Sequence, residues 1–159
     1  MAVAPSAAAR MLPEELEAQR RFFDSVIYSP SPMPVFFLDR PLKEGVWTYF
    51  SDPKLRRTFM FALDEHAKVP EMSPSGKAIL TAWTGHPMSL DLIDLPDDKI
   101  IEKARQDVEW MIPGFAHWVD EAVVFRHPYG IARYPAGAYR RVLDFMEEAP
   151  DSAVPQVQC

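Results

Sequence analysis

The sequence has little glycine and cysteine, and these shortages exclude several kinds of site. Six scattered glycines in 159 residues supply neither the G-x-G-x-x-G fingerprint of a dinucleotide site nor a Walker phosphate loop. The single cysteine, Cys159, cannot form an internal disulfide, so nothing indicates an oxidising compartment. The chain also lacks a G-x-S-x-G elbow and any cysteine–histidine nucleophile arrangement. No self-sufficient catalytic apparatus is therefore predicted.

Long apolar runs and positive charge are missing as well. No stretch approaches the roughly 20 apolar residues of a membrane span, and residues 1–12 do not resemble a signal peptide. The formal net charge is −6 and the pI about 5.2, which argues against a nucleic-acid binder that must neutralise phosphates. The basic run 54–57 is interpreted as a solvated turn. We expect a cytoplasmic protein with no transmembrane segment and no nucleic-acid partner.

The titratable residues do not form a recognisable metal or acid–base site. The four histidines, at positions 66, 86, 117 and 127, do not have metal-ligand spacing. His86 precedes a proline and is interpreted as a solvated turn residue. The acidic group at positions 91, 94, 97 and 98 is interpreted as structural, because most of it leads into a helix. No metal ligand and no catalytic residue is predicted.

Sixteen prolines predict many fixed turns and few long elements. The apolar patterns and breakers predict helices at 13–26, from 94 to 112 and at 138–146, and strands at 35–38, 45–50, 77–84 and 123–125. Residues 57–63 alternate and predict a third strand or a short helix. The serine–proline run 29–34 should end the first helix, and 68–76 should be a loop.

This order of elements predicts an α+β fold, with a mixed or antiparallel sheet and helices packed on one face. The length suits one domain with a real core, so we expect a single domain at 1–149 and a disordered tail at 150–159. Too few crossovers are present for the parallel sheet of a nucleotide-binding domain.

The stretch from Ala122 to Met146 is the best candidate for a site wall. A strand at 123–125 leads into an aromatic loop at 126–134, and a helix then starts through Tyr134-Pro135-Ala136-Gly137. The helix start offers free backbone N–H groups, although an ordinary strand–loop–helix connection explains the same pattern. His127 could line a cleft at the strand exit. Trp83 could line an aromatic pocket or pack in the core.

Four segments resemble, in order and spacing, the flavin-dependent amine oxidase, protoporphyrinogen oxidase and phytoene desaturase superfamily. They are residues 2–12, 26–41, 79–112 and 124–137. Residues 35–41 resemble its "V-x-x-x-x-D-R-P" strand, and Val124–Gly137 resembles its "V-x-R-x-x-x-A-x-P-x-Y-P-x-G" segment. The resemblance covers the substrate-binding portion, whereas the two flavin-binding flanks of the family have no counterpart in this sequence.

The resemblance implies a role for the loop at 126–134 and for the helix start. Tyr129 and Tyr134 would be aromatic walls of the substrate site, and Pro135 and Gly137 would set the helix start beside the cofactor. Arg126 could pair with an acidic substrate group or form a surface ion pair. None of these residues would be a general base, because in such enzymes the flavin carries out the hydride chemistry.

Three functions remain open from the sequence. The chain could be the substrate-binding fragment or subunit of an FAD-dependent oxidoreductase, with FAD bound only together with a separate nucleotide-binding chain and not by this chain alone. It could be a stand-alone binding module for an apolar or aromatic small molecule. It could also be a non-functional remnant, which predicts poor solubility.

Overall fold

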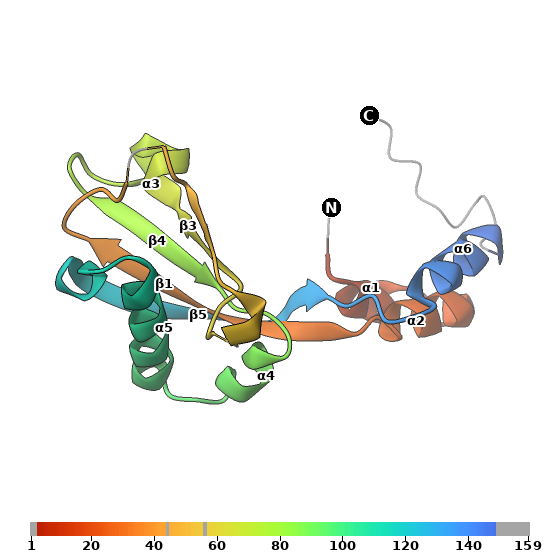
Figure 1. Cartoon of the computed structure of the whole chain (residues 1–159). Helices are drawn as coiled ribbons and strands as arrows, with labels where there is room; N and C mark the ends of the chain where they lie inside the picture. The colour runs from red at the N-terminus through yellow and green to blue at the C-terminus, as the bar shows by residue number, and fades with distance from the viewer. Residues whose placement is uncertain (1–2, 44, 56, 149–159) are drawn as a thin grey trace. The chain divides into compact units, whose positions relative to one another are not determined.

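The computed structural model describes residues 3–43, 45–55 and 57–148. The described chain forms two compact units. The sheet unit comprises residues 29–131, and the helical unit comprises residues 3–28 and 132–148 (Figure 1). The predicted tail at 150–159 lies outside the described residues.

Within the described residues, five strands form one sheet in the order β2-β3-β4-β1-β5. Their bounds are β1 Tyr28–Leu38, β2 Thr48–Phe50, β3 Phe61–Asp64, β4 Ala78–Trp83 and β5 Val119–Ala132. The pairs β1–β4, β2–β3 and β3–β4 are antiparallel. At the end of β1, Asp39 N–H donates to Trp118 O, so β5 also begins where β1 ends. The predicted α+β class with an antiparallel sheet is confirmed.

Helix α5, Asp97–Met111, packs against one face of this sheet. Asp97 and Asp98 in its first turn suit the positive end of the helix dipole. Ile100, Ala104 and Val108 recur every four residues and are fully buried. Ala104 and Val108 form one core with apolar strand residues, namely Phe36, Leu38, Ala62, Ala78, Leu80 and Ala82, and with Phe59 and Phe115. The predicted helix from 94 to 112 is confirmed, with its start three residues later.

The helix α2, Glu17–Asp24, ends before the serine–proline run, as predicted, but the run itself forms the first half of β1, which was not predicted. Alternate residues of a strand point their backbone groups toward opposite neighbours. Asp39 N–H faces β5, so Pro30, Pro32 and Pro34 direct their nitrogens, which lack hydrogen, toward the other side. That side pairs with β4 only from Val35 onward. By this register Pro34 lies opposite Ala82 of β4, so its missing N–H ends the β1–β4 ladder at Val35 and Thr81.

Thr84 satisfies polar groups along this proline edge. Its hydroxyl donates to Pro32 O at 2.7 Å, and the Ser31 hydroxyl donates to Thr84 O at 3.0 Å. Both side chains are buried. Thr84, the residue after β4, thus bonds β1 through its side chain and its carbonyl. These bonds replace the backbone pairing that a longer β4 would have provided.

Strand β5 is much longer than predicted. The expected strand at 123–125 extends over Val119–Ala132, so the predicted loop at 126–134 is wrong for residues 126–132. Pro128 and Gly130 suggested a loop, but β5 is an edge strand, where a missing N–H is tolerated. Gly130 is needed there, because a Cβ atom would lie 2.6 Å from Ser31 Cβ.

The remaining elements of the sheet unit are short. The alternating segment 57–63 contributes β3, so the strand alternative is confirmed with a later start. The second predicted strand shortens to β2. The predicted loop 68–76 contains the single 3-10 turn Pro70–Met72, and it follows α3, Glu65–Lys68, and precedes β4. Helix α4, Met88–Leu92, was not predicted.

The helical unit brings the first and last described segments of the chain together. It contains α1 Pro5–Met11, the 3-10 turn Glu14–Leu16, α2 Glu17–Asp24 and α6 Ala138–Glu148. Phe22 of α2 stacks on Phe145 of α6 with ring centroids 4.0 Å apart and planes 6° from parallel. The helices predicted at 13–26 and 138–146 correspond to α2 and α6, whereas α1 was not predicted.

Candidate functional site

The sheet has a second apolar face, opposite α5. Directly paired residues of antiparallel strands place their side chains on the same face, and the register pairs Val35 with Thr81 and Phe37 with Ile79. It also pairs Phe61 with Trp83. These positions alternate with the core residues that contact α5. Val35 and Thr81 on this face are buried, and Phe37, Ile79, Phe61 and Trp83 are half-buried. The face is therefore apolar and only partly exposed, unlike the polar solvated face that an antiparallel sheet normally carries.

Three aromatic rings cross this face side by side, from β2, β3 and β4; we call Phe50, Phe61 and Trp83 the aromatic row. The Phe50 and Phe61 ring centroids are 6.1 Å apart. Phe61 and Trp83 are 5.8 Å apart with planes 16° from parallel. Phe50 is 77% exposed, and the other two rings are half-buried. The Phe50 and Phe61 planes are tilted by 52°, so the row offers an apolar aromatic contact surface made of ring faces and edges.

Trp83, which the sequence placed in a pocket or in the core, belongs to this row. Its indole Nε1 is buried and has no hydrogen-bond partner among the described residues. A buried indole N–H usually finds a partner. Trp83 pairs with Phe61 on the face opposite α5 and is half-buried there, and the choice between a pocket residue and core packing stays open.

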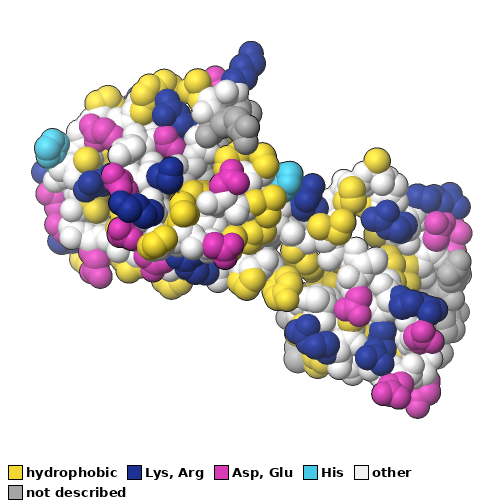
Figure 2. All heavy atoms as spheres, turned by 90° about the horizontal axis from the view of Figure 1, so that it is seen from below, with side chains coloured by type: hydrophobic (Ala, Val, Ile, Leu, Met, Phe, Trp, Pro, Cys, Tyr) yellow, Lys and Arg dark blue, Asp and Glu magenta, His cyan; other side chains and the backbone are white. Residues whose placement is uncertain are grey.

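A pocket of about 550 Å³ adjoins the aromatic row within the sheet unit. Its walls are mostly apolar: Phe50, Phe59, Met60, Phe61, Pro87 and Met88. Ser51, Asp52, Arg57 and His86 add polar groups to the lining. Figure 2 shows hydrophobic side chains reaching the surface between charged ones. The pocket is within the size range of small-molecule sites, about 300–1,000 Å³.

The tyrosines predicted to line the site are both exposed. Tyr129 lies in β5 and is 56% exposed, and Tyr134 follows β5 in the helical unit and is 62% exposed. Tyr134 stacks on Tyr139 with ring centroids 5.4 Å apart and lines a small pocket of about 40 Å³ beside α6. Neither ring is a core residue. Their contact with a substrate stays a prediction.

Arg126 ties β5 to the segment between α4 and α5. Its guanidinium donates to the carbonyls of Ile93 and Leu95 and to the Asp97 carboxylate. This geometry favours the ion-pair alternative over the pairing with a substrate acid. His127, the neighbouring predicted site residue, is exposed on the same strand.

Pro135 and Gly137 lie where the helix start was predicted. Ala138 N–H donates to Pro135 O at 2.9 Å, and Gly137 has φ +81° with open space around the position of a Cβ. A positive φ favours glycine, so Gly137 is needed for the turn into α6. Their role beside a cofactor stays a prediction.

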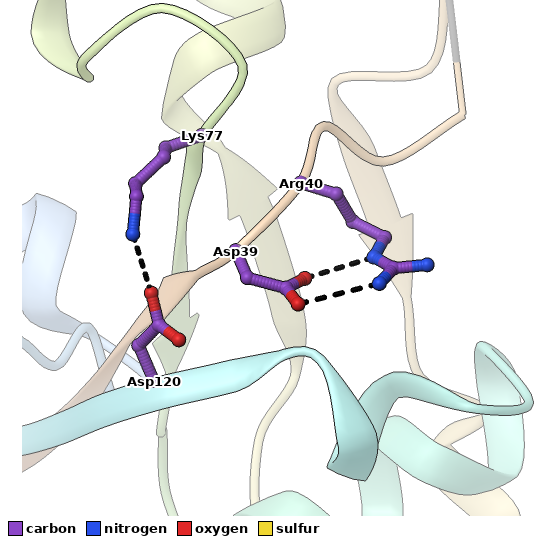
Figure 3. A network of polar contacts seen from close by, with 4 residues as sticks. All are labelled: Asp39, Arg40, Lys77 and Asp120. Atoms are coloured by element: carbon purple, nitrogen blue, oxygen red, sulfur yellow. Dashed lines mark hydrogen bonds and ion pairs between the residues drawn. The ribbon is translucent and has the colours of Figure 1, made fainter.

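A network of charges lies at the end of the sheet where β1 stops and β4 and β5 begin (Figure 3). Arg40 Nε donates to Asp39 Oδ1 at 2.8 Å, and Lys77 Nζ donates to Asp120 Oδ2 at 2.6 Å. The bond from Arg40 lowers the pKa of Asp39, and the bond to Asp120 raises the pKa of Lys77. All four side chains are well exposed, so the network is a surface feature.

The described residues contain no group of histidine, cysteine and acidic side chains that could hold a metal ion. None of the helices in 3–43, 45–55 and 57–148 is long and apolar enough to cross a membrane. What the geometry offers is binding: an aromatic row and an adjoining apolar pocket. The sequence singled out Trp83, whose role at a site stays a prediction, and it did not single out Phe50 and Phe61. The only signals for these two were the predicted strand at 45–50 for Phe50 and the alternation in residues 57–63 for Phe61.

Comparison with known proteins identifies the fold only. The sequence matches no family model and no curated protein. A protein from Exiguobacterium sp. 255-15, provisionally named a protoporphyrinogen oxidase, superposes with a TM-score of 0.67 at 16% identity over 92% of this chain. Reduced UDP-galactopyranose mutase gives 0.65 at 12% identity over 91% of this chain. An oxidoreductase from Methanosarcina mazei gives 0.55 at 17% identity over 79% of this chain.

The matches cover only part of each neighbour. This chain spans 32%, 32% and 30% of the three solved chains. The chain therefore has the fold of about one third of each of these larger solved chains.

Proposed function

We propose that this chain forms the substrate-binding part of an FAD-dependent oxidoreductase, and that the nucleotide-binding part comes from outside these residues. The observation that carries the proposal is the second apolar face of the sheet. An apolar face rich in aromatic rings is costly to leave in water and marks a surface that another body covers. The fold likeness to part of larger enzymes supports the same view.

The described residues fit only the ring side of FAD. The aromatic row is an apolar surface suited to a ring system or to the substrate beside it. No glycine-rich loop is present to hold the diphosphate. When bound, FAD supplies the hydride chemistry. The residues of this chain orient the substrate against the row and exclude water from it.

In this proposal Phe50, Phe61 and Trp83 of the sheet unit form the substrate wall. The roles of Tyr129 and Tyr134 as substrate contacts, and of Pro135 and Gly137 beside the cofactor, rest on the family resemblance. No residue of this chain is assigned as a general acid or base.

The proposal is tested by searching the neighbouring reading frames for a protein with a glycine-rich nucleotide-binding motif, and by producing this chain alone and together with such a protein. Alone, the chain should be colourless and retain no FAD after desalting. The joint preparation should co-elute and show a flavin absorbance band. The proposal would be contradicted if this chain alone held FAD at near-equimolar occupancy. It would also be contradicted if the flavin-loaded partner did not bind this chain.

Two matched variants locate the contact. Phe50→Lys places a charge on the aromatic row, and Leu90→Lys places the same charge on α4; both phenylalanine and leucine are exposed in the free chain. Phe50→Lys should abolish co-elution, whereas Leu90→Lys should preserve it. Equal loss by both variants would mean that the row is not the contact surface.

A stand-alone binding module is the second candidate. It is favoured by the pocket of about 550 Å³, whose lining belongs entirely to this chain. In that case the chain alone should be monodisperse and bind an apolar ligand without a flavin partner. An insoluble chain would instead favour a non-functional remnant.

A further inference from the structure

The pocket beside the aromatic row has one cation in its lining whose position is fixed. Arg57 Nη1 donates to Asp107 Oδ1 at 2.9 Å. The other oxygen of this carboxylate accepts from Thr58 N–H at 2.6 Å. The guanidinium carbon lies 4.5 Å from the centre of the Trp110 ring. Arg57 is thus held from two sides by α5 before any ligand arrives.

This fixed guanidinium keeps unused donors. In the described part of the chain, Asp107 is the only acceptor that it bonds, through Nη1, and its buried Nε has no partner. The side chain is 25% exposed and lines the pocket together with Phe50 and Phe61. An arginine presents five N–H donors in a planar fork that suits a carboxylate.

Arg40 provides a comparison within the same unit. It also lies over a tryptophan, with its guanidinium carbon 5.5 Å from the Trp118 ring. Both its Nε and its Nη2 bond Asp39 (Figure 3). Arg40 therefore already uses two of its guanidinium nitrogens on Asp39, whereas Arg57 uses one on Asp107. Arg40 also does not line the pocket.

The lining also contains one acidic residue, Asp52. Asp52 accepts from Lys54 N–H at 2.9 Å and so is engaged by its own turn. Met60 and Met88 are flexible walls that adapt to the shape of a ligand. The pocket thus combines an apolar aromatic wall, adjustable sides and one preorganised cation.

We propose that this pocket binds a small, flat, apolar monoanion, with its ring against Phe50 and Phe61 and its carboxylate on Arg57. This deepens the proposed function, on which it rests for the identity of the wall: the substrate of the assembled enzyme carries an acidic group, and Arg57 selects for it. Arg57 is a binding residue in this proposal and takes no part in the chemistry.

The experiment compares 2-naphthoate with its neutral analogue 2-naphthamide, titrated calorimetrically into this chain alone at neutral pH. We expect the acid to bind about tenfold more tightly, as a charge-assisted, partly exposed contact allows. Arg57→Gln should remove this preference while the amide still binds. Arg57→Lys should keep most of it, and Arg40→Gln should leave it unchanged. Phe50→Ala should weaken both ligands to a similar degree.

Thermal melting of each variant separates loss of binding from loss of fold. Equal affinity for acid and amide, no binding of either, or a preference that survives in a folded Arg57→Gln protein would overturn the inference. None of these results depends on the flavin-loaded joint preparation. The calorimetric titration therefore tests the anion preference, and the co-elution experiment separately tests the proposed enzyme assembly.

Discussion

Thr84 and Pro32 are joined by a side-chain hydrogen bond, from Thr84 Oγ1 to Pro32 O over 2.7 Å. The two residues lie 52 positions apart in the chain, and Thr84 is fully buried. The bond closes the gap that β4 leaves beside the proline half of β1. It is the contact that lets a proline-rich segment behave as a central strand.

Replacing Thr84 by valine should destabilise the sheet unit. Valine keeps the shape but leaves the Pro32 carbonyl buried without its donor, which costs about 1–3 kcal/mol of unfolding free energy. Urea titration measures the loss. Thr48→Val is the control, because the half-buried Thr48 has no hydroxyl hydrogen bond in the described chain, and its effect should stay within about 0.5 kcal/mol.

Gly130→Ala should also destabilise the protein. The new Cβ would lie 2.6 Å from Ser31 Cβ and 3.1 Å from Ser31 N, so β5 and β1 would have to separate, at a cost of about 1–3 kcal/mol. Gly85→Ala is the comparison, since there the obstacle is the flexible end of the Met60 side chain. A Gly85→Ala loss as large as that of Gly130→Ala would show that strand separation is not the cause.

Glu109 should give stability that depends on pH. Gly114 N–H and Ala116 N–H each donate to its carboxylate at 2.7 Å, and these bonds, that of Ala116 first, lower its pKa. A carboxyl with a lowered folded-state pKa stabilises the fold above its ordinary value of about 4.3, and this contribution disappears as the pH falls through the lowered value.

The measurement is unfolding free energy against pH. Glu109→Gln should be less stable than the parent chain near pH 7, and the difference should shrink in acid below pH about 4. Glu121→Gln, which removes an exposed carboxyl from β5, should follow the parent curve. A Glu109→Gln deficit that persists unchanged in acid would point to packing instead of charge.

Tyr129→Ala should separate binding from stability. Because more than half of its side chain is exposed, its truncation should change the unfolding free energy by less than about 1 kcal/mol. Association with a flavin-loaded partner should weaken. Phe36→Ala, in the core, should cost about 3–5 kcal/mol. A Tyr129→Ala loss on that scale would mean that the ring is structural.

The fold was predictable where the signal is local. Helix α5 has acids in its first turn and an apolar repeat every four residues, and both features act within one turn of helix. Strand β4 is a short apolar run bounded by glycine. The proline half of β1 was not predictable in this way, because its stability depends on Thr84 and β5, which are distant in sequence.

The site was predictable only in part for the same reason. Trp83 stood out at a strand end. Phe50 and Phe61 join it only because three strands pair in one register, and single-sequence patterns do not determine register between distant segments. The exposed tyrosines were suggested by the family resemblance, whereas the pocket at Arg57 depends on a loop–helix contact without a sequence motif.

The prolines of β1 also disfavour one incorrect register between β1 and β4. In the native register Pro34 faces Ala82 of β4, whereas a slip of β4 by two residues toward the beginning of β1 would place Pro34 opposite Leu80 and Pro32 opposite Ala82, so one more β4 carbonyl would lack a donor although the side-chain faces would still match. Hydrophobic patterning alone does not prevent such a two-residue slip, because the same side chains still face the core. The prolines at alternate positions of β1 therefore favour the native register of β1 against β4 during folding.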